Sequence, residues 1–146
     1  MTMMLDDLAL GRHFDCGSFT LTRAAIIAFA EAFDPQPWHL DEELARQTYF
    51  KGLCASGLHT QGAAIGMVVR AISDVAIVAG GSLHEARFFA PVRPDQAYFV
   101  TGRWISARAS ASNPGRGVAE IAIVVSNGDG REVMTCGVTY IVGRRV

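Results

Sequence analysis

The chain has few charged residues and no long apolar run. Of its 146 residues 18% are charged, 50% are hydrophobic, and the formal net charge is −1. Such a balance disfavours a disordered chain and a nucleic-acid-binding protein. The most apolar stretches, 24–30 and 75–79, are far shorter than the roughly 18 residues that a membrane-spanning helix needs. We therefore expect one globular domain over residues 1–146, without nucleic-acid or membrane partners.

Cysteine, histidine and cofactor motifs are also scarce. Cys16, Cys54 and Cys136 form no C-x-x-C pair, and the four histidines show no metal-ligand spacing, so we expect no metal and no disulfide framework. Neither G-x-G-x-x-G nor a P-loop occurs, which disfavours a nucleotide cofactor. The first seven residues lack the basic start and apolar run of a secretory signal, so we expect a cytoplasmic protein without a cofactor.

Positive charge is concentrated in the second part of the chain. Residues 1–86 contain five Lys or Arg and ten acidic residues, whereas residues 87–146 contain eight Arg and four acidic residues. These charges either form solvated faces with mixed pairs or contact a phosphorylated ligand. The candidate arginines are Arg87, Arg93, Arg103, Arg108, Arg116 and Arg131.

Helical segments precede strands, which is the order expected of an α+β protein. Thr22 is placed to cap a helix over 23–33. Asp41 is placed to cap a short helix that ends at about residue 47, and Ser56 to cap the longest helix, which ends at about Ile72. The helix at 23–33 has an apolar face of Ile26, Phe29, Ala30 and Phe33. The spacing of three and four residues that predicts the longest helix is carried by Leu58, Gln61, Ile65, Val68, Val69 and Ile72. Small residues interrupt that helix, which predicts a buried position under a sheet.

Strands are expected over 18–21, 83–90, 97–108, 117–126 and 132–142. Along 117–126, Ile121, Ile123 and Val125 alternate with residues of the opposite face. The turn sequence NGDG at 127–130 is a strong hairpin signal. An antiparallel meander that covers the long helix follows from this pattern.

Asp34 and His39 flank a segment with two prolines, at positions 35 and 37. Because proline denies the backbone regular structure, we expect a rigid, extended loop that fixes both side chains. A carboxylate and an imidazole can share a water molecule and perform general acid-base chemistry near neutral pH. In the alternative interpretation, Asp34 caps a turn and His39 is a polar residue that flanks a helix.

The sequence around this pair resembles the MaoC-like, or (R)-specific enoyl-CoA hydratase, family. Residues 33–45 read FDPQPWHLDEELA and residues 54–60 read CASGLHT. They are similar to the family's D-x-N-P-[LIV]-H motif and to the H-G-M-like segment that opens its central helix. Two further stretches resemble the family's sequence and follow in the expected order. They are ARFFAPVRP at 86–94 and the NGDG turn at 127–130.

This resemblance implies a hot-dog fold, in which an antiparallel sheet wraps a long central helix. It implies that Asp34 and His39 activate the water that adds to a trans-2-enoyl-CoA thioester, or leaves in the reverse dehydration. The backbone N–H of Gly57, at the start of the long helix, is the candidate donor to the charge that develops on the thioester oxygen. Otherwise Gly57 only starts the helix.

Several positions depart from the family pattern and are candidates for substrate binding. Gln36 stands where the family commonly has Asn, and Ser56 stands where His is frequent. Trp38 replaces a smaller residue and either shortens the acyl pocket or belongs to the core. His59 lies close to the helix start and either contacts substrate or is a hydrogen-bonded core residue.

Two further function classes stay open at this point. Hot-dog proteins include thioesterases, which use a carboxylate on or near the central helix, but residues 57–72 contain no carboxylate. A non-catalytic acyl-CoA-binding protein is the other class. Because a hot-dog sheet leaves open edges and a flat face, we expect a homodimer or a higher homo-oligomer.

Overall fold

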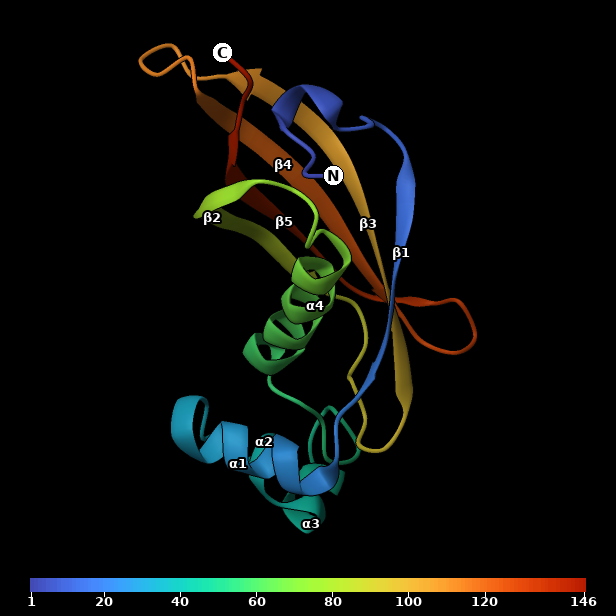
Figure 1. Ribbon diagram of the computed structural model, residues 1–146. Helices are drawn as coiled ribbons and strands as arrows, with labels where there is room; N and C mark the ends of the chain where they lie inside the picture. Colours follow the sequence, from blue (N-terminus) through green and yellow to red (C-terminus); the bar gives the residue numbers. More distant parts are fainter.

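Five antiparallel strands form one curved sheet in the order β1-β3-β4-β5-β2 (Figure 1). The computed structural model describes all residues from 1 to 146. A single 3₁₀ turn, η1, spans Leu5–Asp7 and precedes the first strand. The strands are β1 (His13–Thr20), β2 (Ile77–Phe88), β3 (Ala97–Ala109), β4 (Arg116–Ser126) and β5 (Glu132–Gly143). The predicted α+β architecture is confirmed.

The central strand β4 follows the alternation expected from its sequence. Ile121, Ile123 and Val125 are at most 1% exposed, and β3 and β5 pair with β4 on either side. The buried face of the strand belongs to the hydrophobic core, because side chains two residues apart point to the same face of a sheet.

The long helix α4 (Gly57–Ala71) lies in the hollow of the curved sheet (Figure 1). Its predicted start is confirmed, since the Ser56 hydroxyl accepts a hydrogen bond from the Leu58 N–H at 3.2 Å. The predicted face is only partly buried. Val68 and Ile72 are 0% and 4% exposed, but Leu58 and Val69 are 57% and 47% exposed. Besides Val68, the smaller residues Thr60 and Ala64 are the buried positions of the helix. Small side chains let the helix approach the sheet closely, while the larger ones point away from it.

Three shorter helices lie together beyond one end of α4 (Figure 1). They are α1 (Arg23–Phe33), α2 (Pro37–Leu40) and α3 (Glu42–Arg46). Thr22 and Asp41 cap α1 and α3 as predicted, through hydrogen bonds of 3.1 and 3.0 Å. Phe33, which we placed on the buried face of α1, is 68% exposed, because its helix ends there and leaves the core.

The segment between Asp34 and His39 is not extended throughout. Pro37 occupies the first turn of the helix α2, where a missing N–H costs nothing and the fixed φ of proline favours the helix. The extended part is therefore limited to the residues before Pro37. This short helix turns the His39 side chain inward, and that residue is only 5% exposed.

Two strands are longer than their sequences predict. β1 begins at His13, five residues before the predicted start, and contains an irregularity near Gly17, whose φ is +88°. β2 begins at Ile77 rather than 83 and includes two glycines, which have low strand propensity. Pairing with β5 supplies its hydrogen bonds. None of the helices combines the length and the apolar composition that a bilayer crossing would require.

Arg93 fixes the segment that leads into α4. Its guanidinium donates to the carbonyls of Gly52 at 2.9 Å and Leu53 at 3.3 Å, and also to that of Phe50. From the other side, Glu42 accepts a hydrogen bond from the Leu53 N–H at 3.0 Å. Arg93 was one of the arginines that could contact a phosphorylated ligand. Its guanidinium instead donates to backbone oxygens of the chain itself.

We expect Arg93→Ala to lower the free energy of unfolding by about 2 kcal/mol, because three carbonyls lose a charged donor. Chemical denaturation monitored by circular dichroism measures this change. Arg131→Ala is the matched control, since Arg131 is exposed and makes one long hydrogen bond, at 3.4 Å, to Phe89 O. It should cost less than about 0.5 kcal/mol. Equal losses in the two variants would contradict the assignment.

Candidate active site

A cavity of about 360 Å³ opens where the start of α4 meets the segment after β2. Its floor is formed by side chains that are nearly fully buried, namely Thr60, Val92 and Val133, which are 2%, 4% and 1% exposed. Phe88 and Phe89, at 54% and 51%, and Tyr49, at 90%, form its mouth. The exposed fraction of the lining residues thus falls from the aromatic rim of the cavity to its floor.

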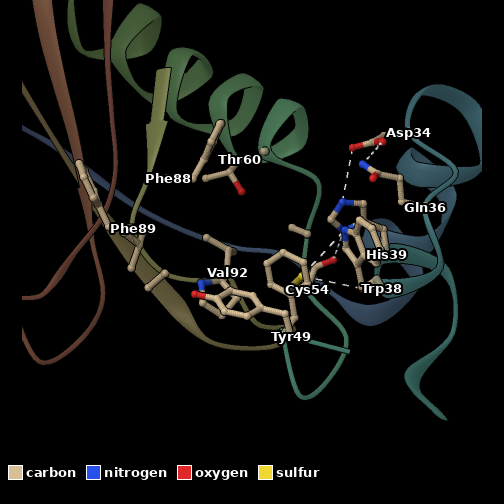
Figure 2. A pocket seen from close by; sticks show the side chains of 16 residues that line it. Asp34, Gln36, Trp38, His39, Tyr49, Cys54, Thr60, Phe88, Phe89 and Val92 are labelled. Atoms are coloured by element: carbon tan, nitrogen blue, oxygen red, sulfur yellow. Dashed lines mark hydrogen bonds and ion pairs between the residues drawn. The ribbon is translucent and has the colours of Figure 1, made fainter. Parts of the chain in front are cut away.

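Asp34 and His39 face one another in the wall of this cavity (Figure 2). The distance from Asp34 Oδ2 to His39 Nε2 is 3.4 Å. The Asp34 carboxylate accepts hydrogen bonds from Ser56 Oγ at 2.6 Å and from Gln36 Nε2 at 2.7 Å. Asp34 is the C-cap residue of α1, so residues of the segment 34–39 and Ser56, the N-cap of α4, meet at one carboxylate.

These contacts hold the pKa of Asp34 below its ordinary value of 3.8. The main cause is the hydrogen bond from Ser56, followed by that from Gln36 and the charge of His39, while burial acts in the opposite direction. Hydrogen bonds to the ionised form favour that form. Asp34 is therefore a carboxylate at neutral pH and can accept a proton or orient a water molecule.

The His39 ring has its tautomer fixed by the backbone. Nδ1 lies 2.7 Å from the carbonyl oxygen of Cys54, and a carbonyl only accepts, so Nδ1 carries the hydrogen. In the neutral ring, Nε2 then presents its lone pair toward Asp34 and the cavity. With His39 neutral, the pair offers two acceptors, and a water molecule that donates one hydrogen to each fits this arrangement.

Gly57 lines the same cavity as the first residue of α4. Its N–H belongs to the first turn, where backbone donors have no partner inside the helix. A Cβ at this position would lie 2.5 Å from Cζ of Phe88. A side chain at this position would therefore displace the Phe88 ring, which lies directly against the backbone.

The remaining predicted residues divide into two groups. Trp38 lines the cavity and packs against Phe50, with ring centroids 5.5 Å apart. Ser56 is fully buried and its hydroxyl is bound to Asp34. His59 is not part of the cavity wall and stacks on Phe29 at 4.5 Å. The structure thus brings Asp34, Gln36, Trp38, His39, Ser56 and Gly57 together and leaves His59 apart.

The sequence did not identify the apolar and aromatic lining. Phe88 and Phe89 belong to the matched stretch 86–94, so their motif was visible, but their direction was not. Thr60 likewise belongs to the matched stretch 54–60 without a visible direction, and Tyr49 had no signal, since it belongs to no recognised pattern. No group of three or more His, Cys, Asp or Glu side chains could hold a metal ion. The arrangement is suited to acid-base chemistry on a bound water molecule.

Comparison with known proteins relates this geometry to a family. The model of the MaoC like domain matches residues 7–120. The crystal structure of a MaoC-like dehydratase from Rhodospirillum rubrum is 36% identical to this chain, with a TM-score of 0.88, and each chain covers 99% of the other.

More distant structures share the fold. The (R)-hydratase PhaJ1 from Pseudomonas aeruginosa is 18% identical, with a TM-score of 0.76 over 99% of this chain and 88% of the other. Rv0216 from Mycobacterium tuberculosis, which has a double hot-dog fold, is 20% identical, with a TM-score of 0.79 over 99% of this chain and 45% of the other. The expected hot-dog fold is confirmed.

Ser56→Ala should raise the pKa of Asp34 toward its ordinary value, because the carboxylate loses its main hydrogen bond. Carbon-13 NMR titration of the Asp34 carboxyl group measures this shift. A lowered pKa stabilises the folded chain above the unfolded value near 3.8, and this stability is lost as the pH falls through the folded pKa. The variant therefore has less stability to lose below about pH 4.

Thr22→Ala is the control, because it also removes a helix N-cap, at α1, without a contact to Asp34. Both variants should lose about 1 kcal/mol of stability from the missing cap. An equal Asp34 pKa in wild type and Ser56→Ala would contradict the assigned cause.

Proposed function

Because this chain belongs to the MaoC-like family of dehydratases and hydratases, we propose that it adds water reversibly to a trans-2-enoyl-CoA or a related enoyl thioester. The observation that carries the proposal is the pair of acceptors at Asp34 and His39, 3.4 Å apart in the wall of a largely apolar cavity. Such a pair orients one water molecule, and the cavity accepts an acyl chain.

Asp34 and His39 would act on that water together. With Nδ1 hydrogen-bonded to Cys54 O, the Nε2 of His39 and the Asp34 carboxylate each accept one water hydrogen. The water oxygen then directs its free lone pair at the β-carbon. As the C–O bond forms, one water proton passes to the pair, and the pair then delivers a proton to the α-carbon and returns to its starting state. Dehydration is the reverse, in which the α-proton and the β-hydroxyl leave as water.

The start of α4 would stabilise the charge of this reaction. Addition to the β-carbon moves electron density onto the thioester oxygen, which becomes enolate-like. The N–H of Gly57 and the positive end of the helix dipole are suited to this charge. Glycine itself has no side chain to hinder the approach of a thioester to this N–H.

Ser56 and Gln36 would be positioning residues, because both act through the Asp34 carboxylate. Their hydrogen bonds, at 2.6 and 2.7 Å, involve different carboxylate oxygens and so fix the plane of the group. Trp38 would limit the acyl pocket from the side. His59, stacked on Phe29, would support this region from outside the cavity.

We expect wild-type protein to consume the enoyl absorbance of crotonyl-CoA and to form the (R)-3-hydroxyacyl thioester. Asp34→Asn and His39→Ala should each lose about 10²- to 10⁴-fold in kcat/KM, because each removes a group that can take up a proton from the water. Asp129→Asn, an identical chemical change in an exposed turn, is the control and should keep wild-type activity. Release of free thiol instead would indicate a thioesterase, and binding without turnover a non-catalytic acyl-CoA-binding protein.

We further infer a homodimer, which would form along β2 and the outer side of α4. β2 pairs with β5 on one side only, so its other edge has free backbone groups. Val78 and Leu83 on this strand are 58% and 60% exposed, and Leu58 and Val69 on α4 are 57% and 47% exposed. A second copy can cover both elements.

The three buried, free cysteines are compatible with the reducing cytoplasm.

Sedimentation analysis at micromolar concentration should give twice the mass of the chain. Leu83→Glu should give the mass of one chain, because a carboxylate would be buried without a partner at the interface. Leu10→Glu introduces the same charge at a residue that is 52% exposed near the N-terminus and should leave the dimer intact. A monomeric wild type would reject the dimer.

A further inference from the structure

The cavity floor contains one polar side chain, that of Thr60. This residue is 2% exposed and lies among apolar neighbours, with Val92 at 4% and Val133 at 1%. Figure 2 shows its hydroxyl directed toward the cavity, beside Phe88. Asp34, Gln36 and His39 stand in the other wall, so Thr60 is separate from the acid-base group.

The Thr60 hydroxyl makes no hydrogen bond within the chain. His59 Nδ1 is the one buried side-chain nitrogen or oxygen without a hydrogen-bond partner. The Thr60 oxygen therefore borders the cavity rather than being sealed in the core. A hydroxyl at this depth needs a partner, because an unsatisfied polar group in an apolar surrounding is destabilising.

We propose that Thr60 determines substrate specificity by hydrogen-bonding a neutral oxygen on the acyl chain. The inference rests on the proposed function, which places the reacting carbons beside Asp34 and His39. The large thioester carrier must leave through the exposed rim of Tyr49 and Phe88, so the far end of the acyl group reaches the floor. The substrate class is then an enoyl thioester with a hydroxyl, ether or ketone oxygen beyond the double bond.

The helix sets the position of this oxygen. Thr60 follows Ser56 by four residues, which is one turn, so it lies about 6 Å farther along α4. Ser56 holds Asp34 at 2.6 Å, and the β-carbon would lie near that carboxylate. With bonds of about 1.5 Å, an oxygen on the δ- or ε-carbon spans this separation.

A charged substituent does not fit the floor. A carboxylate there would need a cation, and the guanidinium of the neighbouring Arg93 is already bound to backbone carbonyls. Burial of an unpaired charge costs far more than burial of a neutral hydroxyl. We therefore expect discrimination against dicarboxylic acyl groups as well as against plain hydrocarbon chains.

The test uses saturated thioesters, which bind without being hydrated. By calorimetry, wild-type protein should bind 5-hydroxyhexanoyl-CoA about tenfold more tightly than hexanoyl-CoA, as expected for one additional neutral hydrogen bond, and should bind adipoyl-CoA least. Thr60→Val, which has the same shape without the hydroxyl, should lose this preference. Thr60→Ser, which keeps the hydroxyl, should retain it. Thermal unfolding verifies that both variants fold.

Equal binding of the first two ligands by wild type, or the same ratio in Thr60→Val, would overturn the inference and leave the hydroxyl to water. The kcat/KM values for trans-2-hexenoyl-CoA and its 5-hydroxy analogue separate this result from the proposed function. Absence of turnover with the binding preference intact would reject hydration and keep the role of Thr60. Turnover of both substrates at equal kcat/KM, without any binding preference, would reject the role of Thr60 alone.

Discussion

The hydrogen bond between Ser56 and Asp34 connects the two parts of the molecule on which the candidate site depends. Ser56 is the N-cap of α4, which lies in the hollow of the sheet, and Asp34 is the C-cap of α1, which lies outside that hollow. One hydroxyl therefore caps α4, through the Leu58 N–H, and holds the carboxylate at 2.6 Å. Because both bonds use the same oxygen, the helix start and the carboxylate cannot move independently.

The backbone next to this hydrogen bond determines the chemistry of the imidazole. The Cys54 carbonyl accepts a hydrogen bond from His39 Nδ1, and the Cys54 N–H donates one to the carbonyl of Trp38. The preceding residues are held by Arg93 and Glu42. The tautomer of His39 thus follows from main-chain geometry, and remote residues such as Arg93 contribute to the site by keeping that geometry.

The most successful predictions from sequence were local ones. The caps at Thr22, Asp41 and Ser56, the 127–130 hairpin and the alternation in β4 depend on neighbouring residues and were confirmed. The predicted face of α4 was only partly buried, with Val68 and Ile72 in the core, because periodicity alone does not show which side of the helix meets the sheet. Small residues around Ala64 face the core, and the larger Leu58 and Val69 are left exposed. The short helix at Pro37 was also missed, because proline fits both an extended loop and a first helical turn.

The sequence by itself determined the fold class, the family and the pairing of Asp34 with His39, since these are written in short motifs and in periodicity. The tertiary structure alone determined which groups of the candidate site contact one another. Only the folded chain shows that the Asp34 carboxylate accepts from Ser56 and Gln36, and that Phe88 lies against Gly57. It likewise shows that Thr60 lines the floor of the cavity. Apart from the local hydrogen bond of Gln36, these contacts join residues far apart in the chain, and no local pattern records them.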